Sequence, residues 1–258
     1  MKGSRREVKR ARWLLLATLA FSGALACRSS IENDPILKLS AQESLVEGKR
    51  LLEGKKYSRA RPYLTHAFEV EPNSAAGREA LLLVADTLYL EGGQANLISA
   101  EAKYRDFQNR FPTSDRAPYV QFQIAGALAR RVERPDRDQS ATVKAVSAYE
   151  DLLRLYPTSD YVDQAKVGLE SVRGHLAEHE FVVGRFYLRF GLPNAAAKRL
   201  EGLLDRFAAY PARDKALFHL AMAYRKLDRD DDAQATFSRL KSEFPASRWI
   251  AKIPKKNR

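Results

Sequence analysis

A spaced pattern that recurs five times does most to limit what this chain can fold into. Each copy has an alanine, a large apolar or aromatic residue four positions later, an apolar residue seven positions later and, in four of the five copies, a proline twelve positions later. Offsets of zero, four and seven fall on one face of an α-helix, and a proline at twelve stops the helix just past its end. The pattern therefore predicts five helices that bury equivalent faces. The repeat alanines are Ala60, Ala100, Ala145, Ala196 and Ala233.

A second helix is expected before each repeat alanine, where small residues would let two helices approach closely. Gly48 and Gly54 precede the first copy, and Gly184 and Gly191 precede the fourth. Such helix pairs resemble tetratricopeptide repeats. The resemblance implies an all-α chain in which about five pairs, over residues 40–250, stack into a right-handed superhelix with a concave binding face.

The copies are longer than usual for this kind of repeat. Successive repeat alanines are 40, 45, 51 and 37 residues apart, whereas tetratricopeptide repeats have a period of about 34 residues. The extra residues are predicted at Gly92-Gly93, in the charged stretch 131–140, and in a lengthened first helix of the fourth copy within 160–190. Pro62 lies inside the second helix of the first copy and predicts a kink there.

The N-terminus has the pattern of a secretion signal over residues 1–26. Six basic residues precede an apolar run of fourteen residues, 13–26. That run is shorter than the roughly 20 apolar residues that a membrane-spanning helix needs, so a permanent transmembrane helix is the weaker interpretation. Arg5-Arg6 also fits part of a twin-arginine signal, but a basic cluster produces such a pair by chance, and ordinary secretion is favoured.

Cys27, the single cysteine, follows this run directly. The sequence from Ala24 to Cys27 resembles a bacterial lipobox, which implies cleavage before Cys27 and lipid attachment to its sulfur. Several acyl chains hold a soluble domain on a bilayer surface. Arg28 replaces the aspartate that signals inner-membrane retention, which favours the periplasmic face of an outer membrane. Residues 27–39 are expected to be a tether and residues 251–258 a basic tail, neither of them packed.

The charge of the chain is positive, with a formal net value of +12 at pH 7. Part of this excess lies in residues 1–26 and would leave with them. A basic exported domain meets anionic lipid or acidic protein surfaces first, and no nucleic-acid-binding signature occurs. A nucleic-acid partner is therefore set aside.

One short motif raises the question of catalysis. His175, Glu178 and His179 match the inverted zinc-peptidase motif, in which two histidines and a glutamate share a helix. The match fixes only three positions inside a repeat helix and lacks a recognisable third ligand, so partly exposed helix residues are the favoured interpretation. No nucleophile motif or cofactor fingerprint occurs elsewhere. We therefore expect no enzyme activity, no metal and no cofactor.

Two segments carry a closer family resemblance. Residues 135–165, in which an Asp-Arg-Asp loop leads into a helix ending in Tyr-Pro-x-Ser, and residues 176–200 resemble the BamD family of the outer-membrane β-barrel assembly machinery. The resemblance implies a lipoprotein that docks on the POTRA domains of a BamA-like barrel subunit and helps to receive unfolded outer-membrane protein precursors. The alternative is another envelope repeat lipoprotein, for example an adaptor in cell-wall synthesis.

Four basic residues are candidates for partner binding. In the repeat register, Lys49, Arg185 and Arg225 belong to first helices that line the concave groove, where a guanidinium can bind a carboxylate with two donors. Solvated surface charges are an equally good interpretation of these three. Arg213 is expected in the loop between the fourth and fifth copies, and by the BamD resemblance it would face an acidic POTRA surface.

Overall fold

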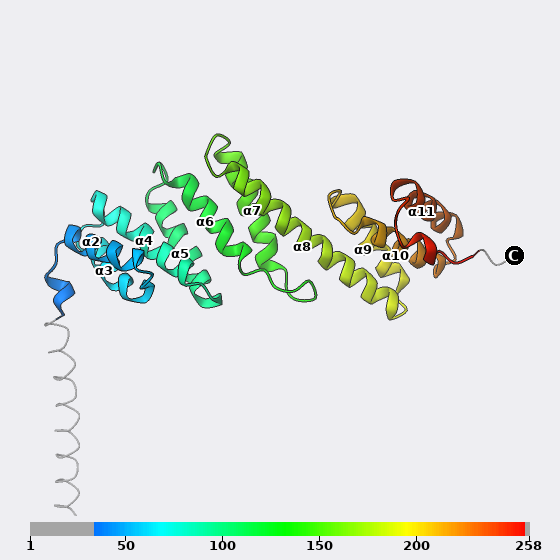
Figure 1. Ribbon diagram of the computed structural model, residues 1–258, viewed down its shortest axis with the longest axis horizontal. Helices are drawn as coiled ribbons and strands as arrows, with labels where there is room; N and C mark the ends of the chain where they lie inside the picture. Colours follow the sequence, from blue (N-terminus) through cyan, green and yellow to red (C-terminus); the bar gives the residue numbers. More distant parts are fainter. Residues whose placement is uncertain (1–33, 256–258) are drawn as a thin grey trace, which may run out of the picture. The chain divides into compact units, whose positions relative to one another are not determined.

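The computed structural model describes residues 34–255, and every regular element in that part of the chain is helical (Figure 1). The expected all-α fold class is therefore confirmed. The predicted signal peptide and Cys27 lie outside the described residues. The chain divides into two compact units, one ending at Glu91 and one beginning at Gly92, and each is described by itself.

Unit 1 contains three α-helices that pack on one another in chain order. The turn before α2 is closed by a capping box, because Ser40 Oγ accepts a hydrogen bond from Glu43 N at 3.2 Å and Glu43 Oε2 accepts one from Ser40 N at 2.8 Å. Leu45, Leu64 and Val84, one from each helix, are buried together. The elements of unit 1 are η1 (Pro35–Lys38), α2 (Ala41–Glu53), α3 (Tyr57–Val70) and α4 (Ala75–Glu91).

Unit 2 contains the other seven α-helices, and each packs on the next along the chain. Its longest helix, α8, has 28 residues, which confirms the predicted lengthening within 160–190. The elements of unit 2 are α5 (Gln94–Arg110), α6 (Ala117–Ala129), α7 (Ser140–Leu155), α8 (Val162–Arg189), α9 (Pro193–Arg206), α10 (Arg213–Arg225), α11 (Asp230–Glu243) and η2 (Ile250–Lys252).

The repeat register predicted from sequence is present in the packing. All five repeat alanines are buried, with exposed fractions of 0 to 2%. Each of the five helices that carry them ends ten residues after its alanine, including α9, in which Ala208 takes the position of the proline. Phe207, the residue after α9, has φ −122° and ψ 70°, close to the φ −134° and ψ 62° of Phe244, which precedes a proline. The fourth copy therefore reaches the same helix end without the proline.

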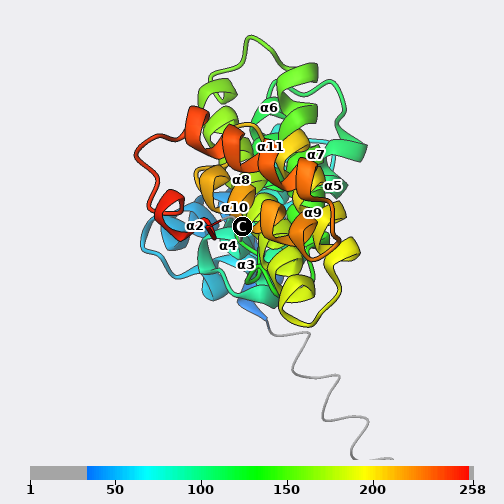
Figure 2. The ribbon, with the colours of Figure 1, turned by 90° about the vertical axis from the view of Figure 1, so that its right-hand side faces the viewer.

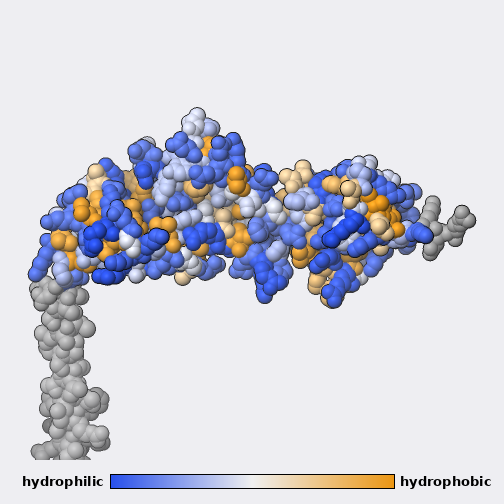
Figure 3. All heavy atoms as spheres, in the orientation of Figure 1, coloured by the Kyte–Doolittle hydropathy of each residue, from blue (hydrophilic) through white to orange (hydrophobic). Residues whose placement is uncertain are grey.

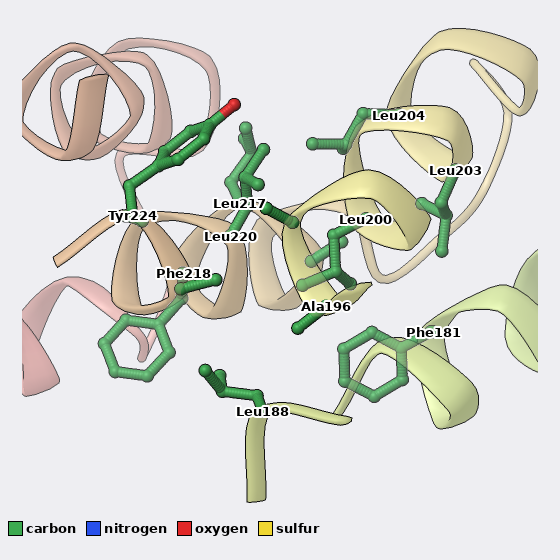
Figure 4. Packing of buried hydrophobic residues seen from close by; sticks show 14 of the residues in the cluster. Phe181, Leu188, Ala196, Leu200, Leu203, Leu204, Leu217, Phe218, Leu220 and Tyr224 are labelled. Atoms are coloured by element: carbon green, nitrogen blue, oxygen red, sulfur yellow. The ribbon is translucent and has the colours of Figure 1, made fainter. Parts of the chain in front are cut away.

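Two of the small residues stand at close helix contacts, as predicted. An ideal Cβ at Gly48 would lie 2.5 Å from Leu64 Cδ2, and one at Gly184 would lie 2.9 Å from Leu200 Cγ. Figure 4 shows Leu200 within the cluster of buried residues that joins α8, α9 and α10. Gly54 and Gly191 instead lie at the C-terminal ends of α2 and α8, and Gly191 has a φ of 74°, which favours glycine.

Pro62 lies on an exposed face of α3, and the helix continues through it from Tyr57 to Val70. Gly92 and Gly93 form the connection between α4 and α5 with φ values of 74° and 82°, and the charged stretch 131–140 leads from α6 into α7. Within residues 34–255, no helix combines the length and the hydropathy needed to cross a bilayer.

The expectation that the flanking segments stay unpacked is wrong for the residues that the structure describes. Element η1 packs on α3, and the Leu39 carbonyl oxygen lies 3.0 Å from His66 Nε2. At the other end, Ile253 packs with Trp249 and Ile250 against the buried residues of α10 and α11. Trp249, Ile250 and Ile253 are partly buried because helices distant in sequence offer them an apolar surface.

Candidate partner-binding surface

Lys49, a predicted partner-binding residue, belongs to an ion pair within unit 1. Its Nζ lies 2.6 Å from Glu79 Oε1, so α2 is joined to α4, and both side chains are about half exposed at 44% and 46%. An exposed pair of this kind contributes about 0–1 kcal/mol to stability. Lys49 therefore already has an acidic partner within the chain.

Arg213 is the first residue of α10, not a loop residue as predicted. Its Nη1 donates hydrogen bonds to the carbonyl oxygens of Leu204 at 2.9 Å and Phe207 at 3.2 Å. The last carbonyls of a helix have no partners within the helix and carry partial negative charge. Arg213 therefore caps the C-terminal end of α9, and it has a structural role in addition to any role in docking.

Arg185 lies on α8 in a cluster of cations and aromatic rings. Its Cζ lies 5.8 Å from the centroid of the Phe181 ring, and Lys215 Nζ of α10 lies 4.1 Å from the same centroid. Cations within about 6 Å of a ring centroid are attracted to the face of the ring. Two helices therefore bring their positive charges to one buried aromatic side chain.

The C-terminal segment extends this cluster. The Trp249 ring lies 5.0 Å from Phe218 and 5.3 Å from His219, and Lys252 Nζ lies 4.4 Å from its centroid. Ser247 fixes the segment by donating a hydrogen bond to Asp214 Oδ2 at 2.6 Å. We call the whole set the basic–aromatic surface; it consists of Phe181, Arg185, Lys215, Phe218, His219, Arg248, Trp249 and Lys252.

Burial and the positive charge of this surface lower the pKa of His219. Burial, together with the nearby charges of Lys215, Arg185 and Lys252, lowers the pKa of His219 from 6.5 to about 4. The imidazole is therefore neutral near pH 7. Its ring lies 5.4 Å from both Phe181 and Phe218, so it acts as one of the aromatic groups that fill the space between the helices.

None of the four cations of the basic–aromatic surface forms an ion pair with a described residue. Arg185, Arg248 and Lys252 are exposed, and Lys215 is partly exposed. Glu180, also on α8, instead pairs with Arg199 at 3.0 Å and Arg206 at 2.9 Å. The basic–aromatic surface thus presents positive charge that is free to meet a negatively charged partner. In Figure 3, hydrophobic residues in orange lie beside hydrophilic residues in blue near the C-terminal end of unit 2.

Arg225, the remaining predicted residue, ends α10 and is partly exposed. Among the described residues, none of the cation–ring contacts of the basic–aromatic surface involves Arg225. The structure therefore brings Arg185 together with residues that sequence reasoning missed, namely Lys215, Arg248, Trp249 and Lys252. The i, i+4 spacing of Lys215 and His219 and the tryptophan before the basic C-terminus were the available signals.

Two of the three residues of the zinc-peptidase motif make unrelated contacts, and the third, His175, is exposed. His179 Nδ1 lies 2.6 Å from the carbonyl oxygen of Pro135, in the loop between α6 and α7. Glu178 accepts a hydrogen bond from the Tyr210 hydroxyl, and burial together with this bond raises the pKa of Tyr210. Across residues 34–255, no group of three or more histidine, cysteine or acidic side chains is arranged to hold a metal ion.

A cleft of about 760 Å³ lies between the first half of α8 and the connection from α9 to α10. Leu169 and Ala177 of α8 lie on one side, and Phe207 and Tyr210 lie on the other. Val167, which also lines the cleft, is 70% exposed. The cleft therefore offers mainly apolar contacts to whatever enters it.

A family model described as "YfiO: Outer membrane lipoprotein" matches residues 38–240. The chain belongs to the YfiO family. The matched residues begin in η1 and end in α11, so they include all ten α-helices in whole or in part.

Relatives of this YfiO family member carry one name. An outer membrane protein assembly factor BamD of Rickettsia prowazekii is 27% identical over 238 residues, which are 92% of each chain. The BamD of Caulobacter vibrioides is 26% identical over 193 residues, 75% of this chain and 62% of the relative. The BamD of Pasteurella multocida is 26% identical over 272 residues, 97% of this chain and 96% of the relative.

Solved structures similar to this YfiO family member include tetratricopeptide-repeat proteins. The TPR2AB domain of yeast Sti1 in its pHSP90 complex has a TM-score of 0.43 and 17% identity, and covers 81% of this chain and 80% of its own. TTC0263 of Thermus thermophilus has a TM-score of 0.36 and 19% identity, and covers 82% of this chain and 95% of its own.

Proposed function

We propose that this YfiO family member is a non-catalytic scaffold of the outer-membrane β-barrel assembly machinery. In this role it docks on the POTRA domains of a BamA-like barrel subunit and helps to receive unfolded outer-membrane protein precursors. The name that its relatives share, outer membrane protein assembly factor, supports the assembly role. The observation that carries the docking role is the set of four unpaired cations on the basic–aromatic surface.

The chemistry of that surface fits an acidic protein partner. Aromatic rings surrounded by cations provide both apolar contact area and donors for carboxylates. Arginines and aromatic residues are also the side chains that contribute most at protein interfaces. Arg185 beside the Phe181 ring and Lys252 beside the Trp249 ring are both exposed, so they are the residues that we expect to meet carboxylates of the partner.

The cleft beside α8 supports the proposed reception of precursors. An unfolded β-barrel precursor exposes apolar side chains, and the cleft supplies apolar contacts from Leu169, Ala177 and Phe207. A photoreactive amino acid at Val167 should therefore cross-link to an unfolded barrel precursor. The same group at Val143, exposed on α7 and absent from the cleft lining, is the control.

The proposed attachment of the chain to the membrane depends on residues outside the described part. Cleavage after residue 26 and lipidation of Cys27 would hold the chain at the periplasmic face of the outer membrane. Residues 27–34 would then form the tether, which ends where η1 packs on α3 and the Leu39 carbonyl oxygen meets His66. Mass spectrometry of the mature N-terminus tests this part: an unmodified cysteine, or a chain retaining residues 1–26, contradicts it.

The docking proposal is tested by affinity purification from detergent-solubilised membranes. Recovery of a BamA-like subunit supports it, and recovery of cell-wall synthesis enzymes supports the alternative adaptor role. Binding of the purified chain to the POTRA domains then locates the contact. We expect the double variant Arg185→Glu, Lys252→Glu to bind about tenfold or more weakly than the parent at low salt. The difference between variant and parent should be smaller at high salt, which screens the charges. Arg134→Glu, which reverses an exposed charge in the 131–140 loop, is the control and should bind as the parent does.

A further inference from the structure

The turn between α8 and α9 carries two exposed phenylalanines, one in the last turn of α8 and one just after it. Phe186 is 53% exposed, Phe190 is 61% exposed and Leu192 is 52% exposed. The rings of Phe186 and Phe190, one helical turn apart, have centroids separated by 4.4 Å. These two are the only phenylalanines among the large apolar side chains exposed within residues 34–255.

The local structure explains why these side chains cannot be buried by their own unit. Leu188 and Phe181 point into the core that α8 shares with α9 and α10, as Figure 4 shows, whereas Phe186 and Phe190 lie on another face of α8. Gly191, with a φ of 74°, then reverses the chain, and Leu192 follows it in an exposed position. The turn lies at the lower edge of unit 2 in Figure 1 and again in Figure 2, where it is yellow.

The sequence that forms this turn carries charge of one sign. No aspartate or glutamate occurs between Glu180 and Glu201, while four basic residues do. Arg189 is exposed and its Cζ lies 5.9 Å from the centroid of the Phe190 ring. Exposed aromatic and aliphatic side chains beside arginines, without acidic neighbours, are the composition of segments that lie in the interface of an anionic bilayer.

We propose that this turn inserts Phe186, Phe190 and Leu192 into the interfacial region of a bilayer that contains anionic lipid. Arg189, whose guanidinium lies over the Phe190 ring, binds the phosphates of the lipid headgroups, because a guanidinium presents donors in the planar geometry that a phosphate accepts. A projecting turn enters such an interface readily, whereas a protein partner for it would have to supply a matching apolar pocket. This contact is additional to any lipid on Cys27 and does not depend on the proposed docking.

Vesicle flotation tests the proposal with a chain that cannot be lipidated. The chain begins at residue 27 with Cys27→Ser, which leaves every contact among residues 34–255 in place. We expect it to float with vesicles of phosphatidylethanolamine and phosphatidylglycerol, and to bind vesicles of phosphatidylcholine alone much more weakly. Phe186→Ser with Phe190→Ser should reduce the partition coefficient about tenfold, since each ring loses apolar contact with the bilayer.

Two matched controls test whether vesicle binding depends on this turn or on exposed apolar and basic side chains in general. Leu155→Ser with Val143→Ser removes two side chains that are 49% and 53% exposed elsewhere in unit 2, and should leave flotation unchanged. Arg189→Gln should weaken binding to the anionic vesicles, whereas Arg154→Gln, at an exposed arginine of α7, should not. Arg189 is preferred to Arg185 here because Arg185 also belongs to the basic–aromatic surface.

Failure of the parent chain to bind the anionic vesicles would overturn the proposal, as would equal binding by the double phenylalanine variant. Loss of POTRA binding in that variant with vesicle binding retained would also overturn it, because the turn would then be a protein interface. Circular dichroism of each variant verifies that the helices are intact. A failed docking proposal would leave the vesicle result unaffected, so the two can be judged separately.

Discussion

The guanidinium of Arg213 donates a hydrogen bond to the carbonyl oxygen of Leu204 at 2.9 Å, which ties the first residue of α10 to the last turn of α9. A second bond from the same nitrogen reaches Phe207. Charge reversal at Arg213 therefore changes a helix cap as well as a surface charge. A loss of partner binding in Arg213→Glu would not by itself place this residue in an interface.

We predict that Arg213→Gln lowers the free energy of unfolding by about 1–3 kcal/mol, because two helix-end carbonyls lose a charged donor. Denaturant unfolding measures the change. Arg225→Gln, at a partly exposed arginine in the last turn of α10, should change stability by less than about 0.5 kcal/mol. A variant of Arg213 as stable as the parent would show that the cap contributes nothing.

Ala145 tests the repeat register. Its side chain is fully buried in α7, so Ala145→Leu inserts three carbons into a filled space and should destabilise the chain by about 1–3 kcal/mol. Ala102→Leu places the same side chain on an exposed position of α5 and should be nearly neutral. Thermal unfolding of both variants gives the comparison, and an unchanged midpoint for Ala145→Leu would contradict the register.

Two glycines of α8 should respond to alanine in opposite directions. At Gly174 nothing lies within 4 Å of an added Cβ, so Gly174→Ala should stabilise the helix by about 0.5–1 kcal/mol. At Gly184 the added Cβ would lie 2.9 Å from Leu200 Cγ, and displacing that side chain should destabilise the core by about 1–3 kcal/mol. If both variants shifted the unfolding midpoint upward, the contact between α8 and α9 would be looser than described.

We predict that His219 makes the stability of the folded chain sensitive to acid. Its pKa is about 4 in the folded chain and 6.5 as the ordinary value, so below about pH 6.5 the unfolded chain takes up a proton that the folded chain does not. Stability is therefore lost as the pH falls from about 6.5 to 4, by about 1–2 kcal/mol after allowance for screening.

His219→Phe removes this titration and keeps an aromatic ring, so the variant should lose less stability than the parent between pH 7 and pH 5. Urea unfolding at the two pH values measures the difference. His175→Gln removes an exposed histidine of α8 and should show the pH dependence of the parent. Identical pH dependence in the parent and His219→Phe would rule out His219 as the source.

The helices could be predicted in detail because the sequence pattern that specifies each one lies within that helix. The repeat alanines, the apolar residues four and seven positions later, and the helix ends all follow from periodicity within single helices. The expected start of α10 was misplaced, because Ala212 and Arg213 carry no distinctive N-terminal signal, and the N-cap residue has no side-chain cap. Residues 251–258 were expected to be unpacked, because their lysines obscured the apolar Ile253.

The candidate surface was only partly predictable, because it depends on contacts between elements far apart in the sequence. Arg185, Lys215 and Lys252 come from α8, α10 and η2, and only the folded chain shows that they surround one group of rings. Lys49 was predicted from its position in the repeat, but sequence alone could not show that Glu79, thirty residues away, neutralises it. Lipidation of Cys27 stays a prediction.

The constant distance from each repeat alanine to the end of its helix has a consequence for how such a chain can be lengthened. All five helices end ten residues after their repeat alanine. The spacing between successive alanines nevertheless varies, at 40, 45, 51 and 37 residues, so the extra residues must lie before an alanine or after the end of its helix. The segment from alanine to helix end thus acts as a fixed module, and evolution or an engineer can add residues on either side of it without resetting the interior of the neighbouring copy.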